Sequence, residues 1–184
     1  QTTAAVATEV TVLTATATTT IPPETTAATE SETTVAVTST IPESDPFFQE
    51  HETWFKAYMD YRTITNTDSV QYAMEQNAWT DDRGLRRMAD DYLVAMGTGW
   101  LESGCGERFA VTLENGSEFT VRVGDIKADQ HTDKTHRYRS CESGANVLEF
   151  IVDTGMLSGE ARNAGTVSVY PELSGNITAI VPAE

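Results

Sequence analysis

Short apolar runs separated by turn residues dominate the second half of the chain and most limit the folds open to it. Phe109–Leu113 and Phe119–Val123 alternate apolar and polar residues, and Asn115-Gly116 lies between them. Asn-Gly between two alternating runs is a strong short-range signal of a β-hairpin. The other expected strands are Tyr92–Met96, Val147–Val152, Thr166–Tyr170 and Ile177–Val181. Six short strands predict a mainly β fold, and a small barrel is the arrangement that they favour.

The first 45 residues differ in composition from the rest of the chain. Sixteen of the first 40 residues are Thr, and most of the others are Ala, Val, Glu and Pro, without an aromatic residue. Such a segment buries too little apolar surface to offset the entropy lost when its chain is ordered. We therefore expect a disordered Thr- and Pro-rich stalk, of the kind often O-glycosylated outside cells.

A helical region is predicted between the stalk and the strands. Asp45-Pro46 suits a helix start, because Asp caps free N–H groups and Pro fits the first turn. Apolar residues from Phe47 to Met59 recur at helical spacing, which predicts a helix that ends near Tyr61-Arg62. A second short helix is expected over Ser69–Asn77. The expected parts of the chain are a stalk (1–45), a helical segment packed on the barrel (46–90) and the barrel itself (91–184).

The formal net charge of −16 excludes some classes of partner. An acidic surface without a basic patch repels phosphate, so we expect no binding of nucleic acid. No apolar run is long enough to cross a membrane. The chain has no initiator Met, so we expect an exported protein from which a signal peptide has been removed. We expect it to be extracellular or attached to the cell wall, monomeric and without a cofactor.

The two cysteines, Cys105 and Cys141, are too far apart in sequence for a redox or zinc motif of the CxxC type. They are candidates for one disulfide that closes a long loop, which would suit an exported protein. Two unrelated buried thiols are an equally good interpretation.

Several stretches of the chain are similar to known proteins. They are Tyr58–Asn66, Trp79–Asp81, Gly84–Arg86, Val94–Thr98, Val123–Asp133 and Val147–Thr154. They resemble a group of exported proteins of Gram-positive gut bacteria, over about residues 54–182. The part from Tyr92 onward is similar to the three-aspartate (3D) domains of membrane-bound lytic transglycosylases and stationary-phase muralytic enzymes. This resemblance implies a six-stranded double-psi β-barrel and an enzyme that acts on the glycan strands of peptidoglycan.

Two apolar strands end in an acid, Asp125 after one and Asp153 after the other. Carboxylates at the ends of buried strands are costly unless they are paired, solvated or used. The resemblance implies that Asp153 is the catalytic acid/base and Asp125 its electrostatic partner. One carboxyl then protonates the glycosidic oxygen and afterwards takes the proton of the sugar's own 6-hydroxyl. The alternative is that both acids only cap turns.

Polar residues that follow Asp125 are the expected substrate contacts. Lys127 and His131 are candidates for placing the substrate, and Asp129 and Asp133 alternate with His131. On an extended strand these three would face one way and suit a divalent metal, although a hydrogen-bonded rim that faces the substrate is the favoured interpretation. Tyr61 and Arg62 are further candidates for binding the substrate.

Two other functions fit the same residues. A non-catalytic carbohydrate-binding or expansin-like, wall-loosening module would use the same groove. Asp153-Thr154-Gly155 also spells the aspartic-protease signature, in which two such aspartates share one site. The sequence contains no second Asp-Thr-Gly or Asp-Ser-Gly, so a protease would have to be a homodimer and is a remote alternative.

Overall fold

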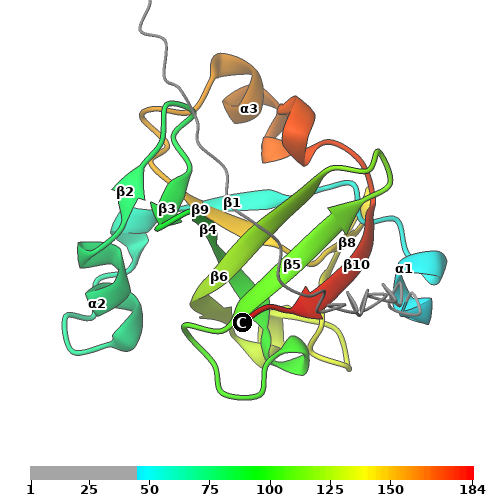
Figure 1. The fold of residues 1–184 in the computed structure, drawn as a ribbon, viewed down its shortest axis with the longest axis horizontal. Helices are drawn as coiled ribbons and strands as arrows, with labels where there is room; N and C mark the ends of the chain where they lie inside the picture. The colour runs from blue at the N-terminus through cyan, green and yellow to red at the C-terminus, as the bar shows by residue number, and fades with distance from the viewer. Residues whose placement is uncertain (1–44) are drawn as a thin grey trace, which may run out of the picture. The chain divides into compact units, whose positions relative to one another are not determined.

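The computed structural model describes residues 45–184, which form many short strands and helices (Figure 1). The strands are β1 (Ala57–Asp60), β2 (Trp79–Thr80), β3 (Arg86–Met88), β4 (Asp91–Gly97), β5 (Arg108–Leu113), β6 (Glu118–Lys127), β7 (Arg139–Cys141), β8 (Gly144–Asn146), β9 (Glu149–Val152) and β10 (Ile177–Pro182). The α-helices are α1 (Pro46–Glu50), α2 (Val70–Gln76) and α3 (Gly159–Ala164). The 3₁₀ helices are η1 (Tyr61–Thr63), η2 (Thr98–Trp100), η3 (Asp129–His131), η4 (Val167–Val169) and η5 (Pro171–Leu173). The stalk predicted for residues 1–45 lies outside the described residues, apart from Asp45.

One mixed sheet holds most of the strands together. Six strands follow one another in the order β1-β9-β4-β6-β5-β10, and β2 and β3 attach to β4 through β3. The β1–β9 and β4–β6 pairs are parallel, whereas β9–β4, β6–β5 and β5–β10 are antiparallel. The β7–β8 pair forms a separate two-stranded sheet. The mainly β class predicted from the sequence is therefore confirmed.

The two end strands of this path, β1 and β10, share no ladder among the strands of residues 45–184. Thr53, which precedes β1, connects them by hydrogen bonds instead. Its Oγ1 accepts from the N–H of Ile177 at 2.7 Å, and its own N–H donates to Oδ1 of Asn176 at 2.7 Å. Thr53 is fully buried, and hydrogen bonds shielded from water are stronger than exposed ones. One threonine thus joins the two ends of the six-strand path.

Strand β4 lies at the centre of the core, and all seven of its residues are buried. It has strand neighbours on both edges, β6 on one and β9 with β3 on the other, which explains its continuous apolar sequence. The rings of Tyr92, Phe119 and Phe150 contact one another from β4, β6 and β9, with centroids 5.5–6.2 Å apart. In Figure 1, α2 and the β2–β3 hairpin lie on one side of this core and α1 on the other.

Locally encoded elements agree with the sequence predictions. Strands β5 and β6 form the expected hairpin, and Gly116 takes a φ of +83°, which glycine adopts without strain. Helix α2 falls within the predicted range 69–77. Its N-terminus is capped by Ser69, whose hydroxyl accepts from the N–H of Tyr72.

Two predicted elements are wrong. The helix expected from Pro46 to Arg62 ends at Glu50, and residues 57–60 instead form β1, paired in parallel with β9. Aromatic residues fit strands well, and the long-range pairing outweighs the helical spacing. The strand expected over Thr166–Tyr170 is the 3₁₀ helix η4, because the Thr166 hydroxyl caps it by accepting from the N–H of Ser168.

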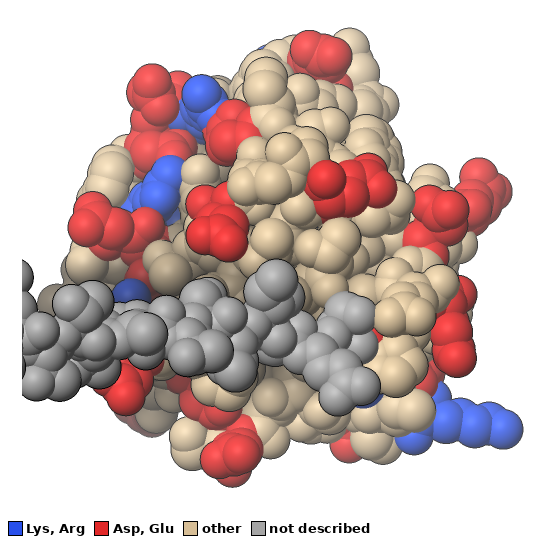
Figure 2. Space-filling view, turned by 45° about the vertical axis from the view of Figure 1, so that its right-hand side comes forward, with Lys and Arg blue, Asp and Glu red and all other residues tan. Residues whose placement is uncertain are grey.

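Residues 46–90 do not stand apart from the rest of the domain. They supply β1, which pairs with β9, and β3, which pairs with β4. No helix among residues 45–184 is long and apolar enough to cross a membrane. Acidic side chains are spread over the face seen in Figure 2, with Lys and Arg at few places.

Candidate functional site

A bulge in β6 brings Asp125 to the surface of the sheet. Val94 pairs with Val123 and Ala95 with Asp125, so Gly124 is one residue too many on β6. Such a bulge redirects the side chains that follow it. A Cβ at Gly124 would lie 2.8 Å from the Cδ1 atom of Ile151, so glycine is the residue that fits the bulge without a shift.

Asp125 lines an open groove of about 290 Å³, here called the Asp125 groove. Its ionisable lining residues are Asp125, Lys127, His131, Arg139 and Glu149. Lys127 and Asp125 come from alternate positions of β6, Glu149 begins β9, His131 ends η3 and Arg139 begins β7. The structure therefore gathers three residues expected from the sequence and two that the sequence analysis missed.

The register of the sheet explains why Glu149 belongs to this groove. Ala95 pairs with Asp125 on one side of β4 and with Glu149 on the other. The two acids consequently lie at the same level of the sheet, two strands apart. The sequence did not predict Glu149 as a site residue, because the antiparallel pairing of β9 with β4 leaves no local signal in the sequence.

Lys127 is the buried cation of the groove, with 6% of its side chain exposed. Its Nζ lies 3.8 Å from Oε2 of Glu149 and donates to the carbonyl of Asn146 at 3.4 Å. Burial lowers the pKa of Lys127 to about 8, although Glu149 acts in the opposite direction. At neutral pH the groove therefore presents a fixed ammonium group beside one of its two carboxylates.

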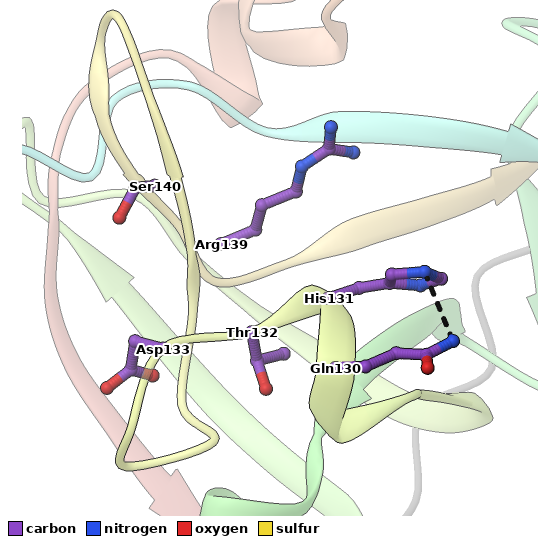
Figure 3. Close-up of a pocket in the computed structure, with 6 residues that line it drawn as sticks. All are labelled: Gln130, His131, Thr132, Asp133, Arg139 and Ser140. Carbon is purple, nitrogen blue, oxygen red and sulfur yellow. Dashed lines mark hydrogen bonds between the residues drawn. The ribbon is translucent and has the colours of Figure 1, made fainter.

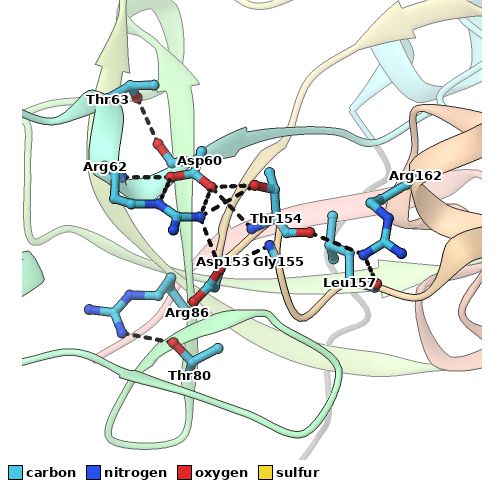
Figure 4. Close-up of polar contacts among 10 residues, drawn as sticks. All are labelled: Asp60, Arg62, Thr63, Thr80, Arg86, Asp153, Thr154, Gly155, Leu157 and Arg162. Atoms are coloured by element: carbon cyan, nitrogen blue, oxygen red, sulfur yellow. Dashed lines mark hydrogen bonds and ion pairs between the residues drawn. The ribbon is translucent and has the colours of Figure 1, made fainter.

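Asp153 does not meet Asp125, contrary to the expectation of facing strand ends. It follows the last residue of β9, whereas Asp125 lies level with the first. Figure 4 shows what Asp153 does instead: Nη2 of Arg62 donates to its Oδ1 at 3.0 Å and also to Oδ2 of Asp60 at 2.7 Å. Arg62 thus ties the ends of the parallel strands β1 and β9 together.

Asp60 is the centre of that cluster. It accepts hydrogen bonds from Arg62 and from the hydroxyl and N–H of Thr154. The Arg62 guanidinium, helped by Thr154, holds the pKa of Asp60 well below its usual range. Thr154, part of the protease-like signature, is engaged here in joining β9 to β1.

The run from Asp129 to Asp133 is not an extended strand, because residues 129–131 form η3. Asp129 accepts from the Thr98 hydroxyl at 2.7 Å and does not line the Asp125 groove. Asp133 accepts from the Thr135 hydroxyl and from the backbone N–H groups of residues 135, 137 and 138, and these bonds outweigh burial and lower its pKa to about 2. No group of three or more His, Cys, Asp or Glu side chains in the described part of the chain is placed to hold a metal ion.

The remaining candidates lie next to the groove. His131 and Asp133 line a neighbouring pocket of about 470 Å³, where His131 and Arg139 extend to one side of the loop and Asp133 and Ser140 to the other (Figure 3). Tyr61 and Arg62 line another pocket, beside α2.

Of the two interpretations of the cysteines, the structure agrees with unpaired thiols, since Cys105 and Cys141 are both free. Burial, with a smaller contribution from Asp125, raises the pKa of the Cys105 thiol. The Cys141 thiol donates to the carbonyl of Gly144 at 3.5 Å.

No protein-family model matches the chain, and no curated protein or solved structure matches it at a significant level. The interpretation of the site rests on its own geometry. That geometry is an open groove with two carboxylates at one level of the sheet and a buried ammonium group beside one of them.

Proposed function

We propose that the protein is an exported enzyme that cleaves the glycan strands of peptidoglycan in the manner of a lytic transglycosylase. One observation carries the proposal: Asp125 and Glu149 share an open groove, on either side of Ala95. Paired carboxylates around a scissile glycosidic bond are the usual machinery for cleaving it. The resemblance of residues 123–133 and 147–154 to three-aspartate domains, stated from the sequence, implies the same reaction but with Asp153 as the acid/base.

Asp125 is the acid/base in this proposal. Glu149 is paired with Lys127, whereas the one hydrogen bond that the Asp125 side chain makes within residues 45–184 is a long one, 3.4 Å, from the amide of Gln71. The Asp125 carboxyl gives its proton to the glycosidic oxygen as the bond to the anomeric carbon breaks. The carboxylate then takes the proton of the 6-hydroxyl, whose oxygen bonds to the same carbon and closes a 1,6-anhydro ring. The proton that Asp125 gives up is thus replaced by the one from the 6-hydroxyl, and no water is consumed.

Glu149 and Lys127 have electrostatic roles. Positive charge develops on the sugar ring as the glycosidic bond breaks, and the Glu149 carboxylate stabilises it. Lys127 holds that carboxylate in place through the ion pair of 3.8 Å. Because Lys127 is buried, the pair is positioned before the substrate arrives.

We also propose that the six-strand path is a double-psi type of barrel. Two parallel pairs, β1–β9 and β4–β6, interrupt an otherwise antiparallel order, and Thr53 joins its two ends. This arrangement places Asp125 and Glu149 on neighbours of the same central strand.

Digestion of purified sacculi tests the proposal. We expect products that end in 1,6-anhydromuramic acid by mass spectrometry, and a loss of at least about a hundredfold in rate for Asp125→Asn and Glu149→Gln. Asp153→Asn is the matched control, because its carboxylate lies at the other end of β9 and we expect it to keep the activity. Binding to sacculi without any product would instead identify a non-catalytic wall-binding module. A folded Asp125→Asn variant with normal activity would contradict the assignment.

A further inference from the structure

The Asp125 groove does not end at its own residues. Towards α2 it meets a hollow of about 240 Å³ that Asp125 itself also lines, together with Ile64, Thr65 and Gln71. Ile64 and Thr65 in turn line a pocket of about 350 Å³, here called the tyrosine pocket. The residues of the tyrosine pocket used below are Tyr61, Thr65, Thr67, Tyr72, Glu75 and Gln76.

In the other direction the groove continues into the pocket of Figure 3, here called the loop pocket. His131 and Arg139 line both the Asp125 groove and the loop pocket. Shared lining residues therefore connect four hollows in one series, with Asp125 and Glu149 in its interior and a pocket at each end.

The tyrosine pocket has unused binding groups. Within residues 45–184, the side chains of Thr65, Thr67, Tyr72 and Gln76 form no hydrogen bond with the protein. The pocket also contains Glu75, whose Oε1 is buried and has no hydrogen-bond partner there. Hydroxyl, amide and carboxylate groups around an aromatic ring are the groups that a sugar engages.

The two tyrosines of this pocket are not equivalent. Two guanidinium groups already lie over the ring of Tyr61: that of Arg86 is 4.6 Å from the ring centre, and that of Arg62 is 5.2 Å from it. The ring of Tyr72 lines the same pocket but makes no ring-stacking or cation–π contact within residues 45–184. Its ring is therefore the one available to the apolar face of a bound sugar.

We propose that the tyrosine pocket and the loop pocket hold sugars of the same strand on opposite sides of the cleaved bond, so that the enzyme cuts within long strands and not at their ends. This inference rests on the proposed function. A groove closed at one end would accept only a strand terminus, whereas a series of hollows that continues past both carboxylates accommodates an internal segment. Tyr72 contributes to the recognition of strand length and takes no part in the chemical step.

Binding without turnover tests the pocket independently of catalysis. The Asp125→Asn variant is titrated calorimetrically with chitooligosaccharides of two, four and six sugars. We expect the affinity to rise about tenfold or more with length, and a Tyr72→Ala substitution added to that variant to remove about tenfold of the affinity for the six-sugar ligand. Trp79→Ala, added in the same way, is the matched control, since Trp79 is half exposed but lines none of these four hollows. Equal affinity for all lengths, or equal losses in both substituted proteins, would overturn the proposal.

The products show where the strand is cut. With glycan strands freed of their peptides, we expect the wild-type enzyme to shorten the mean strand length early, before disaccharides accumulate. Disaccharides released from the outset would overturn cleavage within strands while leaving the proposed reaction intact. No anhydro product at all, together with length-dependent binding, would contradict the proposed reaction and leave the groove as a binding site for long strands.

Discussion

Nζ of Lys127 lies 3.8 Å from Oε2 of Glu149, and Lys127 has a pKa of about 8 because it is buried. The carboxylate opposes the effect of burial by favouring the charged ammonium. We therefore predict that Glu149→Gln lowers the pKa of Lys127 below its value in the wild type. An NMR titration of the lysine side chains measures this shift. Glu142→Gln, in the exposed turn between β7 and β8, is the control and should leave the pKa unchanged.

The burial of Lys56 should make the folded protein more stable in alkaline solution. It is fully buried, Nζ donates to the carbonyls of Trp54 and Gly175, and burial lowers its pKa from 10.5 to about 8. Between these two values the unfolded chain binds more protons than the folded one, so raising the pH through this window stabilises the fold. Across this pH window, the loss of the Lys56 proton raises the free energy of unfolding by about 2–3 kcal/mol.

Denaturant unfolding of the wild type and of Lys56→Met at pH 8 and pH 10 measures this contribution. From pH 8 to pH 10 the free energy of unfolding should rise less in the Met variant than in the wild type, whatever the absolute stability of the variant. An identical dependence on pH in both proteins would contradict the prediction. Lys134→Met, at an exposed loop position, is the control.

Asp91 predicts a loss of stability in acid. It is 1% exposed and accepts hydrogen bonds from Arg122 on the adjacent strand β6 and from Arg108 on β5, the next strand beyond β6. The bonds from Arg108 are the largest cause that lowers the pKa of Asp91 from 3.8 to about 2. Because the folded pKa is depressed, the stabilisation is complete above pH 4 and disappears as the pH falls through about 2.

We predict that Asp91→Asn costs about 3 kcal/mol of unfolding free energy at pH 7, because it leaves two guanidinium groups without their carboxylate. The variant should also lose part of the acid dependence between pH 4 and pH 2. Asp90→Asn is a matched control one residue away, exposed and expected to change stability by less than about 0.5 kcal/mol. Chemical denaturation monitored by tryptophan fluorescence measures both effects.

The free cysteines predict that reductant has no effect on stability. In guanidinium without reductant, both Cys105 and Cys141 should be alkylated, as counted by intact mass. In the folded protein Cys105 should react slowly near pH 8, since burial raises its pKa and only the thiolate reacts. An unmodified protein whose mass is lower by two hydrogens would show a disulfide and contradict the structure.

Local signals in the sequence predicted the local elements. Asn115-Gly116 specified the β5–β6 hairpin, whereas the strand expected to end at Val123 continues past the bulge at Gly124 to Lys127. The strand pairing of β1 and the position of Glu149 could not be predicted in this way. Both depend on β9, far along the chain, and neither a periodicity nor a cap encodes which strand becomes the neighbour.

The helix expected beyond Glu50 failed for the same reason. Aromatic residues at helical spacing in the segment 51–60 also suit a strand, and the outcome depended on contacts with Asn176, Ile177 and β9. The acid that directly follows β9, Asp153, was correctly expected from the sequence, but Arg62 of η1 binds its carboxylate and gives it a structural role.

The parallel pairing of β1 with β9 also sets the order of events during synthesis. In the sheet, β9 is the one partner of β1 among the strands of residues 45–184, and it follows β1 by most of the domain's length. A ribosome adds roughly 5–20 residues per second, so β1 waits on the order of ten seconds for its neighbour. During that time β1 is an unpaired strand, and a chain interrupted before residue 149 cannot complete its sheet. Translation speed or a holding chaperone should therefore influence the yield of folded protein.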